Sequence, residues 1–521
     1  MRGRPTPSIG TTEAKLQQRK LDALTRGVHR IKDVDSLPYG IHMIGVGGAG
    51  AHVIEQVLRD VPDDLLQVEG SRFSALAVDI GDHDLEGIRA LAARLPASRA
   101  QVESIALDVP TSQDLLASLQ RYRDFLKLEY PLYHWNPDYE PWLPPETAVP
   151  KAGEPMPRAV AKAIYGKAYY DGVRPMFSAL RRFARSVEAT EGDAVVCIVF
   201  GLGGGTGSGI ALDLARHLSN GLFGRRVLVT GIGIAPCDRD TPQHVGAHLF
   251  PVMNELDCLG DQDKNRGITM PCGDLFKNPF TAGFLMVPQQ HVCAAATTLE
   301  ETHRRVNQEI ASLLTLRHGA NLWEVLRLLN WVAAPATQHS AARTPWGPRW
   351  IHMLGFADTT CSAGDPVTVA AGLPRQMGLR PGYSPEFIEM RVASAAAAQN
   401  TGLVESVQTA FAPVVPPSAV DGGREGSVQF VLPRVSKTDV DFFHTARDAY
   451  DAQPPAEKLL NHALLLDQGV VLCEPSTRLE GMGGASYSGS KRWVAVPMAD
   501  LRGELNTPSL HIVDQENSHA A

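Results

Sequence analysis

The sequence predicts an α/β protein with a parallel sheet covered by helices on both faces, a long central helix, and then a smaller mixed α/β domain. Over residues 40–330, short apolar segments that suit buried strands alternate with helical segments. Glycine-rich loops join a strand to a helix at two places in this part. Beyond about residue 340 the pattern changes to short strands separated by Gly, Pro and Ser, which indicates a second domain.

The expected elements follow the periodicity of the apolar residues. Buried strands are predicted at 40–46, 73–80, 193–200, 226–234 and 283–288. Helices are predicted at 51–59, 84–95, 112–129, 158–187, 210–218 and 297–318. Residues 131–157, rich in Pro, Tyr and Trp, are expected to form a long loop. The second domain is expected to contain strands at 350–356, 427–433, 463–473 and 492–497.

Composition narrows the class of protein. Hydrophobic residues make up 44% and charged residues 20% of the 521 residues, as in ordinary globular proteins. The formal net charge of -8 argues against a nucleic-acid partner, which usually requires a basic chain. The seven cysteines include no CxxC pair, so neither a zinc site nor a disulfide framework is expected. Because neither a secretory signal nor a transmembrane run is recognisable, a cytoplasmic location is predicted.

The N-terminal extension carries a basic helical pattern. Between residues 13 and 32, Leu21, Leu24, Val28 and Ile31 share one face of the predicted helix. Two interpretations fit this pattern. The helix packs on the main domain, or it is an amphipathic basic helix that contacts a membrane, a membrane adaptor or another partner.

The first glycine loop, GVGGAG at 45–50, lies between a predicted strand and a predicted helix. Small residues let the backbone approach a phosphate, and a helix N-terminus offers free N–H groups to an anion. The loop fits the GxGxxG pattern of Rossmann-like dinucleotide sites, in which an acidic residue follows about 20 residues later. Asp79 lies at the end of the next predicted strand, but it follows the glycine loop at a greater distance than this pattern requires. The motif alone is compatible with NAD, FAD, ATP, GTP or a tight turn without a ligand.

The second glycine loop, GLGGGTGSG at 201–209, is more specific. So many glycines are costly in chain entropy unless the backbone has a task. Consecutive N–H groups before a helix form an anion-binding nest, and Thr206 and Ser208 add hydroxyl donors. The loop lacks the GK[ST] of a Walker motif. A dinucleotide fold has no use for a second phosphate loop, so the pair of loops favours another nucleotide-binding class.

GGGTGSG at 203–209 resembles the signature phosphate loop of the tubulin/FtsZ superfamily. GVGGAGAHVIEQV, which begins at Gly45, resembles the first phosphate loop of FtsZ. The order of the elements also agrees: first loop, acidic residue after the second strand, long helix, second loop. The chain is therefore identified as a divergent FtsZ-like or tubulin-like protein. This resemblance implies a Rossmann-like GTPase domain that binds GTP or GDP with Mg²⁺.

The resemblance implies roles for individual residues. The two loops would hold the phosphates through Gly47, Gly48, Ala49, Gly50, Gly204, Gly205, Thr206, Gly207 and Ser208. Asp79 would lie near the ribose and the magnesium ion, unless it merely caps its strand. Gly153, in a proline-rich segment, falls where the family has a loop that senses the terminal phosphate.

Further positions match the ribose and base contacts of the family. The family has a proline, an acidic residue and a basic residue at a fixed spacing, which is matched here by Pro236, Asp240 and His244. Asp240 would then bind ribose hydroxyls. His244 replaces the family's arginine, and it equally suits a surface position. His303 would stack on the guanine and Asn307, one helical turn later, would bind its edge. The alternative for this pair is a solvated helix face.

The loop after the long helix departs from the family pattern. In the superfamily this loop carries Asn-x-Asp-x-x-acid and completes the catalytic site of the neighbouring subunit. Here Asn321 matches the asparagine, but Trp323 and Leu326 stand at the acidic positions. Glu324 is the nearest carboxylate and the candidate for positioning the attacking water, or it is an ordinary acid at a helix N-terminus. Whether GTP is hydrolysed is therefore open.

The resemblance implies a domain order and three hypotheses. The order is an N-terminal extension (1–36), a nucleotide-binding domain (37–296), a central helix with the catalytic-type loop (297–330), a second α/β domain (331–510) and a tail (511–521). The first hypothesis is a GTPase that assembles with itself head to tail into filaments, in membrane remodelling or cytoskeletal organisation. The second is a non-hydrolysing GTP-binding scaffold or regulator. The third is a dinucleotide-dependent oxidoreductase, which leaves the second loop unexplained.

Overall fold

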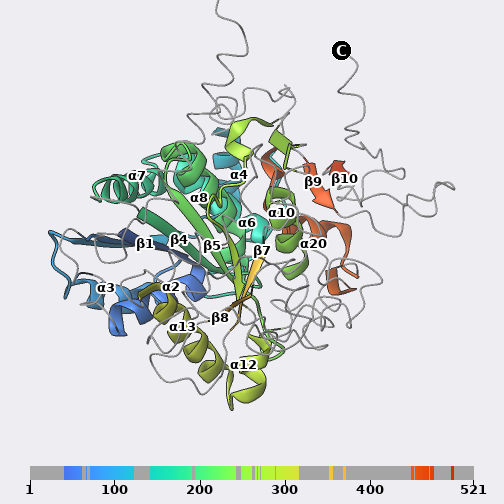
Figure 1. The fold of residues 1–521 in the computed structure, drawn as a ribbon. Coiled ribbons are helices and arrows are strands. Elements are labelled where there is room, and N and C mark those ends of the chain that lie inside the picture. Colours follow the sequence, from blue (N-terminus) through green and yellow to red (C-terminus); the bar gives the residue numbers. More distant parts are fainter. Residues whose placement is uncertain are drawn as a thin grey trace, which may run out of the picture.

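The computed structural model describes residues 40–60, 66, 71–121, 141–190, 194–241, 248–260, most of 265–315, 351–355, 368–370, most of 448–473, and 494–497. In this part of the chain, one sheet dominates, with the strand order β3-β2-β1-β4-β5-β6-β7-β8 (Figure 1). The strands are β1 (Gly40–Val46), β2 (Phe73–Ile80), β3 (Ala100–Leu107), β4 (Ala194–Gly201), β5 (Leu228–Ile234), β6 (Gly283–Val287), β7 (Ile351–Gly355) and β8 (Thr368–Ala370).

The sheet is parallel from β3 to β7, and only β8 runs antiparallel to its neighbour. The predicted α/β class with a Rossmann-like parallel sheet is confirmed. Every residue of β1, β2 and β5 is buried, which explains why these strands are continuous apolar runs rather than alternating ones. Strand β3 was not predicted, because it lies at the sheet edge and its residues are mostly half-buried.

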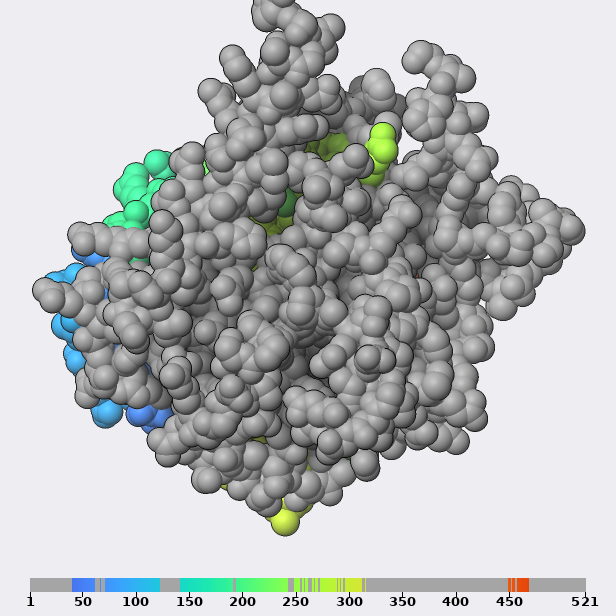
Figure 2. All heavy atoms as spheres, in the orientation of Figure 1, coloured from blue at the N-terminus to red at the C-terminus, as the bar shows by residue number. Residues whose placement is uncertain are grey.

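Helices cover both faces of the sheet (Figure 1). One layer contains α2 (Gly47–Asp60), α3 (Glu86–Ala92), α12 (Gln290–Ala295) and α13 (Leu299–Thr315). The other contains α4 (Ser112–Arg121), α6 (Arg158–Tyr170), α7 (Pro175–Glu188) and α8 (Gly205–Arg216). In the space-filling view, atoms of the first part of the described chain, in blue, reach the surface along one flank (Figure 2). No described helix combines the length and the apolar character needed to cross a membrane.

The helix predicted at 158–187 is two helices. Gly172 has φ +58° and Arg174 has φ +47°, so the backbone turns to the left-handed region between α6 and α7. Pro175 then begins α7, because proline suits the first helical turn and disfavours a helical residue before it.

The two glycine loops lie where the strand order reverses. From β1 the chain builds outward through β2 and β3, and it then crosses back to place β4 on the other side of β1. The two central strands are in register, with Val46 opposite Phe200. Because ligands bind outside the carboxyl ends of parallel strands at such a switch point, a ligand site is expected at the ends of β1 and β4.

The later part of the chain is described only in segments. Strand β7, which the sequence assigned to the second domain, pairs with β6 in the main sheet. Within the strand predicted at 463–473, only β9 (Val470–Cys473) is extended, and it pairs antiparallel with β10 (Val494–Pro497). Residues 461–468 instead form turns and a short 3-10 helix (Leu466–Gln468) beside α6 and α10 (Leu249–Gly260). The predicted strand at 427–433, the N-terminal extension and the tail lie outside the described residues, and the domain boundaries stay predictions.

Candidate functional site: a pocket at the switch point

A pocket of about 650 Å³ opens at the carboxyl ends of β1 and β4. This is within the usual size range of small-molecule sites, about 300–1,000 Å³. Most residues that the sequence singled out for nucleotide binding line it: Gly47, Gly48, Ala49, Asp79, Gly153, Gly204, Gly205, Thr206, Gly207, Asp240, His303 and Asn307. Segments far apart in the sequence therefore converge on one cavity.

Two helices begin at this pocket. Helix α2 starts at Gly47 and α8 starts at Gly205, so each helix presents its first turn to the cavity. The first N–H groups of a helix have no partner within the helix, and the helix dipole is positive at this end. Two such ends in one pocket favour an anionic ligand such as a chain of phosphates.

The loops require glycine at specific positions. Gly47 has φ +70°, a conformation that residues with a side chain rarely adopt. A Cβ atom on Gly205 would lie 1.5 Å from the carbonyl oxygen of Met156, so only glycine fits between α8 and the preceding segment. A Cβ atom on Gly204 would meet nothing within 4 Å. The loop is thus packed tightly behind Gly205 and is open at Gly204.

Two predicted residues lie behind the pocket rather than in its lining. A Cβ atom on Gly50 would lie 2.3 Å from the carbonyl oxygen of Val199, so this glycine allows α2 to pack closely on the sheet. The buried Ser208 hydroxyl donates to the carbonyl oxygen of Gly204 (2.6 Å) and accepts a hydrogen bond from Arg158 Nε (2.9 Å). Both residues shape the loops from inside the protein.

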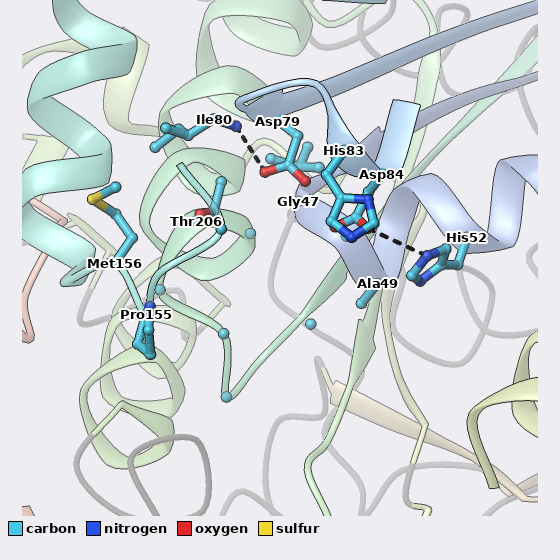
Figure 3. A pocket seen from close by; sticks show the side chains of 18 of the residues that line it. Gly47, Ala49, His52, Asp79, Ile80, His83, Asp84, Pro155, Met156 and Thr206 are labelled. Atoms are coloured by element: carbon cyan, nitrogen blue, oxygen red, sulfur yellow. Dashed lines mark hydrogen bonds and ion pairs between the residues drawn. The ribbon is translucent and has the colours of Figure 1, made fainter. Parts of the chain in front are cut away.

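Asp79 lies on the wall formed by the end of β2 (Figure 3). Its carboxylate accepts a hydrogen bond from the backbone N–H of Ile80 (2.7 Å), and the residue is 8% exposed. Burial raises the pKa of Asp79 to about 7, and the nearby Asp84 carboxylate adds to the increase, against the opposing hydrogen bond from Ile80. His52 on α2 lies 3.6 Å from Asp84. This wall therefore brings two carboxyl groups close together, and a cation bound here would favour the ionised form of Asp79.

The opposite side of the pocket comes from the segment after β5 and from α13. Asp240 accepts a hydrogen bond from the backbone N–H of Cys237 (2.8 Å). His303 Nε2 lies 3.5 Å from Asp240 Oδ1, which brings α13 against this segment. Asn307 follows one helical turn after His303 and also lines the pocket. The arrangement leaves a carboxylate, an imidazole and an amide facing the same cavity.

Sequence reasoning missed several lining residues, including His52, Asp84 and Gln289. Gln289 follows β6, and its buried side-chain oxygen has no hydrogen-bond partner among the described residues. The rule that ligands bind at the carboxyl ends of parallel strands points to Gln289 and to the residues after Asp79. His52 carries no comparable signal, because a histidine within a helix is usual on many surfaces.

Some predicted positions cannot be compared with the pocket. Asn321 and Glu324, the candidates for hydrolysis, lie outside the described residues. His244, which stands where the family has an arginine, also lies outside the described residues. The pocket lining therefore contains most of the binding residues that the sequence predicted, and Gly50 and Ser208 lie behind it.

The fold is a Rossmann-like α/β sheet, and the pocket at its switch point has two helix N-termini that favour an anionic ligand. Residues 43–249, which include both glycine loops, match the model of a family described as "Tubulin like". This match supports the predicted resemblance to tubulin-like proteins over this part of the chain. No curated protein shows significant similarity to the chain.

Solved structures that the chain is similar to include CetZ and TubZ. CetZ from Methanosaeta thermophila strain DSM 6194 is 11% identical, with a TM-score of 0.37, over 79% of this chain and 91% of that chain. TubZ of Bacillus thuringiensis serovar israelensis in GDP-form protofilaments is 13% identical, with a TM-score of 0.31, over 56% of this chain and 62% of that chain. Its GTPγS-form protofilament is 13% identical, with a TM-score of 0.32, over 60% and 67% of the two chains.

Proposed function

We propose that this protein binds GTP or GDP with Mg²⁺ in the switch-point pocket and assembles head to tail with copies of itself into filaments. One observation carries the nucleotide proposal. Two glycine loops, on adjacent parallel strands, present two helix N-termini to one cavity. A single phosphate group needs only one such end, whereas a chain of phosphates can occupy both.

In this proposal, backbone N–H groups provide most of the hydrogen bonds to the phosphates. The N–H groups at the start of α2 and of α8 donate to phosphate oxygens from two sides, and the Thr206 hydroxyl adds a further donor. Since no lysine or arginine lines the pocket among the described residues, the cation is expected to neutralise much of the phosphate charge. Asp79 is the residue that would hold Mg²⁺.

The charge state of Asp79 suits this role. A buried carboxyl whose pKa is raised to about 7 gains most from a bound cation, because the cation favours the ionised form. Magnesium takes oxygen ligands and keeps several waters, so one carboxylate together with phosphate oxygens suffices. Bound Mg²⁺ would supply charge neutralisation at the terminal phosphates, and Asp79 would hold and orient it.

The remaining groups fit the nucleoside. Asp240 can accept hydrogen bonds from ribose hydroxyls, and the neighbouring His303 ring can stack on a base. Asn307 offers one donor and one acceptor to a base edge. Guanine, with adjacent donors and an acceptor, is the base that we propose. A dinucleotide would use the first loop alone and leave the GGGTGSG loop without a ligand.

Nucleotide identity is tested by binding a fluorescent GTP analogue to the purified full-length chain, with GTP, ATP and NAD as competitors. The proposal predicts displacement by GTP and GDP at much lower concentration than by ATP. Binding of NAD without binding of the GTP analogue or of GTP would instead support the dinucleotide-dependent oxidoreductase.

Assembly and hydrolysis are tested together by GTP turnover against protein concentration, with sedimentation in parallel. Turnover per molecule that rises with concentration, and falls in Glu324→Ala but not in the control Glu300→Ala, would support an assembly-coupled GTPase. Glu300 is a matched acid in the first turn of α13. Tight GTP binding with flat turnover in all three proteins would favour the non-hydrolysing scaffold. No pelleting with GTP at any concentration would reject filament assembly.

A further inference from the structure

A second cluster of chemically reactive side chains lies beside the pocket. Cys237 and Asp238 follow β5, and Cys293 lies on α12. Their ligand atoms, two sulfurs and one carboxylate oxygen, all lie within 4.8 Å of one another. Cys293 Sγ is 3.4 Å from Asp238 Oδ1. Both thiols are buried, whereas Asp238 is exposed to solvent.

The backbone around the cluster is fixed by contacts that do not involve the thiols. The backbone N–H of Asp238 donates to Gln290 Oε1 (2.9 Å) at the start of α12. Arg239 Nη1 donates to the carbonyl oxygen of Ala296 (2.8 Å) just after α12. These two bonds clamp the segment after β5 to both ends of the helix that carries Cys293. The three ligand atoms are therefore held together before any ion binds.

We propose that Cys237, Asp238 and Cys293 form a binding site for a divalent cation of the Zn²⁺ class. Thiolate ligands select soft or borderline ions such as Zn²⁺, whereas Mg²⁺ and Ca²⁺ prefer oxygen ligands alone. In a tetrahedral site with Zn–S bonds of about 2.3 Å, two sulfurs lie about 3.8 Å apart. That separation is within the limit that the cluster already satisfies.

The coordination gives the ion three anionic protein ligands and leaves the site with one net negative charge. Each thiol releases one proton to solvent when it binds the ion, and the Asp238 carboxylate provides the third ligand. Water fills the fourth position on the exposed side of Asp238. Because both thiols must lose their protons to bind, the ion competes with protons for the two sulfurs. Zinc affinity is consequently expected to increase with pH.

The site would join two sides of the nucleotide pocket. The segment after β5 supplies Pro236 and Asp240 to the pocket lining, and Gln289 lies directly before α12. A bound ion would fix the distance between these two segments. The site does not depend on what the pocket binds, because none of its three ligands lines the cavity.

The first experiment uses the full-length wild-type protein in the presence of a reductant that does not bind metals. The protein is stripped with a chelator and titrated with Co²⁺ and then with Zn²⁺, with excess Mg²⁺ throughout. The expected result is one Co²⁺ per chain with thiolate-to-cobalt charge-transfer absorption, which stoichiometric Zn²⁺ abolishes. X-ray absorption of the zinc form should show two sulfur ligands together with oxygen ligands. A zinc site without sulfur, or no retained ion with both thiols reduced, would overturn the proposal.

Variants then assign the ligands. Loss of an outer-shell partner alone lowers metal affinity about 10–100-fold, so Cys237→Ser and Cys293→Ser should each lower zinc affinity by more than about a hundredfold. Asp238→Asn should weaken binding less. The matched control is Cys197→Ala, a buried cysteine in β4 away from the cluster, which should bind zinc as the wild type does. Unchanged affinity in both Cys237→Ser and Cys293→Ser would place the ion elsewhere and reject the site. Since the cobalt spectrum is recorded on the wild type, a variant that fails to fold leaves the test intact.

Discussion

Arg158 donates two hydrogen bonds to Ser208, from Nε to the hydroxyl and from Nη2 to the carbonyl oxygen, both at 2.9 Å. The same guanidinium donates from Nη1 to the carbonyl oxygen of Asn461 (2.8 Å) and pairs with Glu255 on α10. Glu255 in turn accepts from the backbone N–H of Ala463 (2.8 Å). One buried side chain thus links the second glycine loop to the C-terminal segment.

We expect Arg158→Ala to destabilise the fold strongly. Burial disfavours the charged form of Glu255, but Arg158 and His462 together keep the pKa of Glu255 low. Removal of the guanidinium would leave a buried carboxylate without its main cationic partner, at a cost of about 4 kcal/mol. The measurement is the free energy of unfolding in urea. Arg182→Ala, which breaks a surface ion pair with Glu103, is the control and should change little. Equal unfolding midpoints for the two variants would contradict this prediction.

Two neighbouring glycines should respond differently to the same substitution. Gly205→Ala is expected to destabilise the protein by more than about 2 kcal/mol, because its methyl group would overlap the carbonyl oxygen of Met156. Gly204→Ala has room for the methyl group and should fold normally, but it narrows the pocket that Gly204 lines. Thermal unfolding and GTP affinity of both variants separate the two effects. A Gly205→Ala protein as stable as Gly204→Ala would refute the close packing behind the loop.

Asp79 should make both stability and Mg²⁺ binding depend on pH. The folded carboxyl keeps its proton up to about pH 7, whereas the unfolded one loses it near 3.8. The folded state therefore binds more protons in between, and its stability falls as pH rises through this window. Magnesium needs the ionised form, so Mg²⁺ affinity in the presence of GTP should increase toward pH 7 and then level off.

The measurement is a pH series of thermal unfolding without nucleotide and of Mg²⁺ titrations with GTP. Asp79→Asn should remove both slopes. Asp82→Asn serves as the control. The hydrogen bond from Arg89 lowers the pKa of Asp82, so any pH dependence that Asp82 causes lies at lower pH. Slopes in Asp79→Asn that match the wild type would assign the titration to another group.

Asn307→Ala should reduce the preference for guanine. Loss of a paired amide at a base edge costs about 1–3 kcal/mol, so GTP affinity should fall about tenfold or more while ATP affinity changes little. Gln308→Ala on the same helix is the control, since Gln308 accepts a hydrogen bond from Arg304 instead of lining the pocket. The ratio of GTP to ATP affinity is the quantity to measure. An unchanged ratio in Asn307→Ala would remove this residue from base recognition.

The sequence predicted best those features whose cause is local. The glycine loops are recognisable in the sequence because close approach of two backbone segments requires glycine. Gly205 is an example, since its backbone packs directly against the carbonyl oxygen of Met156. The central strands were recognisable because burial on both faces makes them apolar throughout. Strand β3 was missed because a half-exposed edge strand has no such run. The break at Gly172–Pro175 was missed, because one helix was predicted over 158–187 although glycine and proline commonly end helices.

Features that depend on tertiary contacts were not predictable from the sequence. Cys237 and Cys293 are separated along the chain without a recognisable motif, and only the pairing of β5 with β6 brings their segments together. The same applies to Arg158 and Glu255, because a buried ion pair leaves no periodic signal. Asp84 could be associated with Asp79 only once the turn after β2 was known.

The two halves of the pocket are built on different supports. In the proposed binding mode, the phosphate side rests on β1 and β4, whose register fixes both loops to the same sheet edge. The proposed base side includes α13, which carries His303 and Asn307 and contributes nothing to the sheet. Under this proposal, the residues that select the base are carried by a different element from the loops that bind the phosphates. Redesign of α13 alone should retune which nucleotide the protein accepts while the triphosphate cradle stays intact.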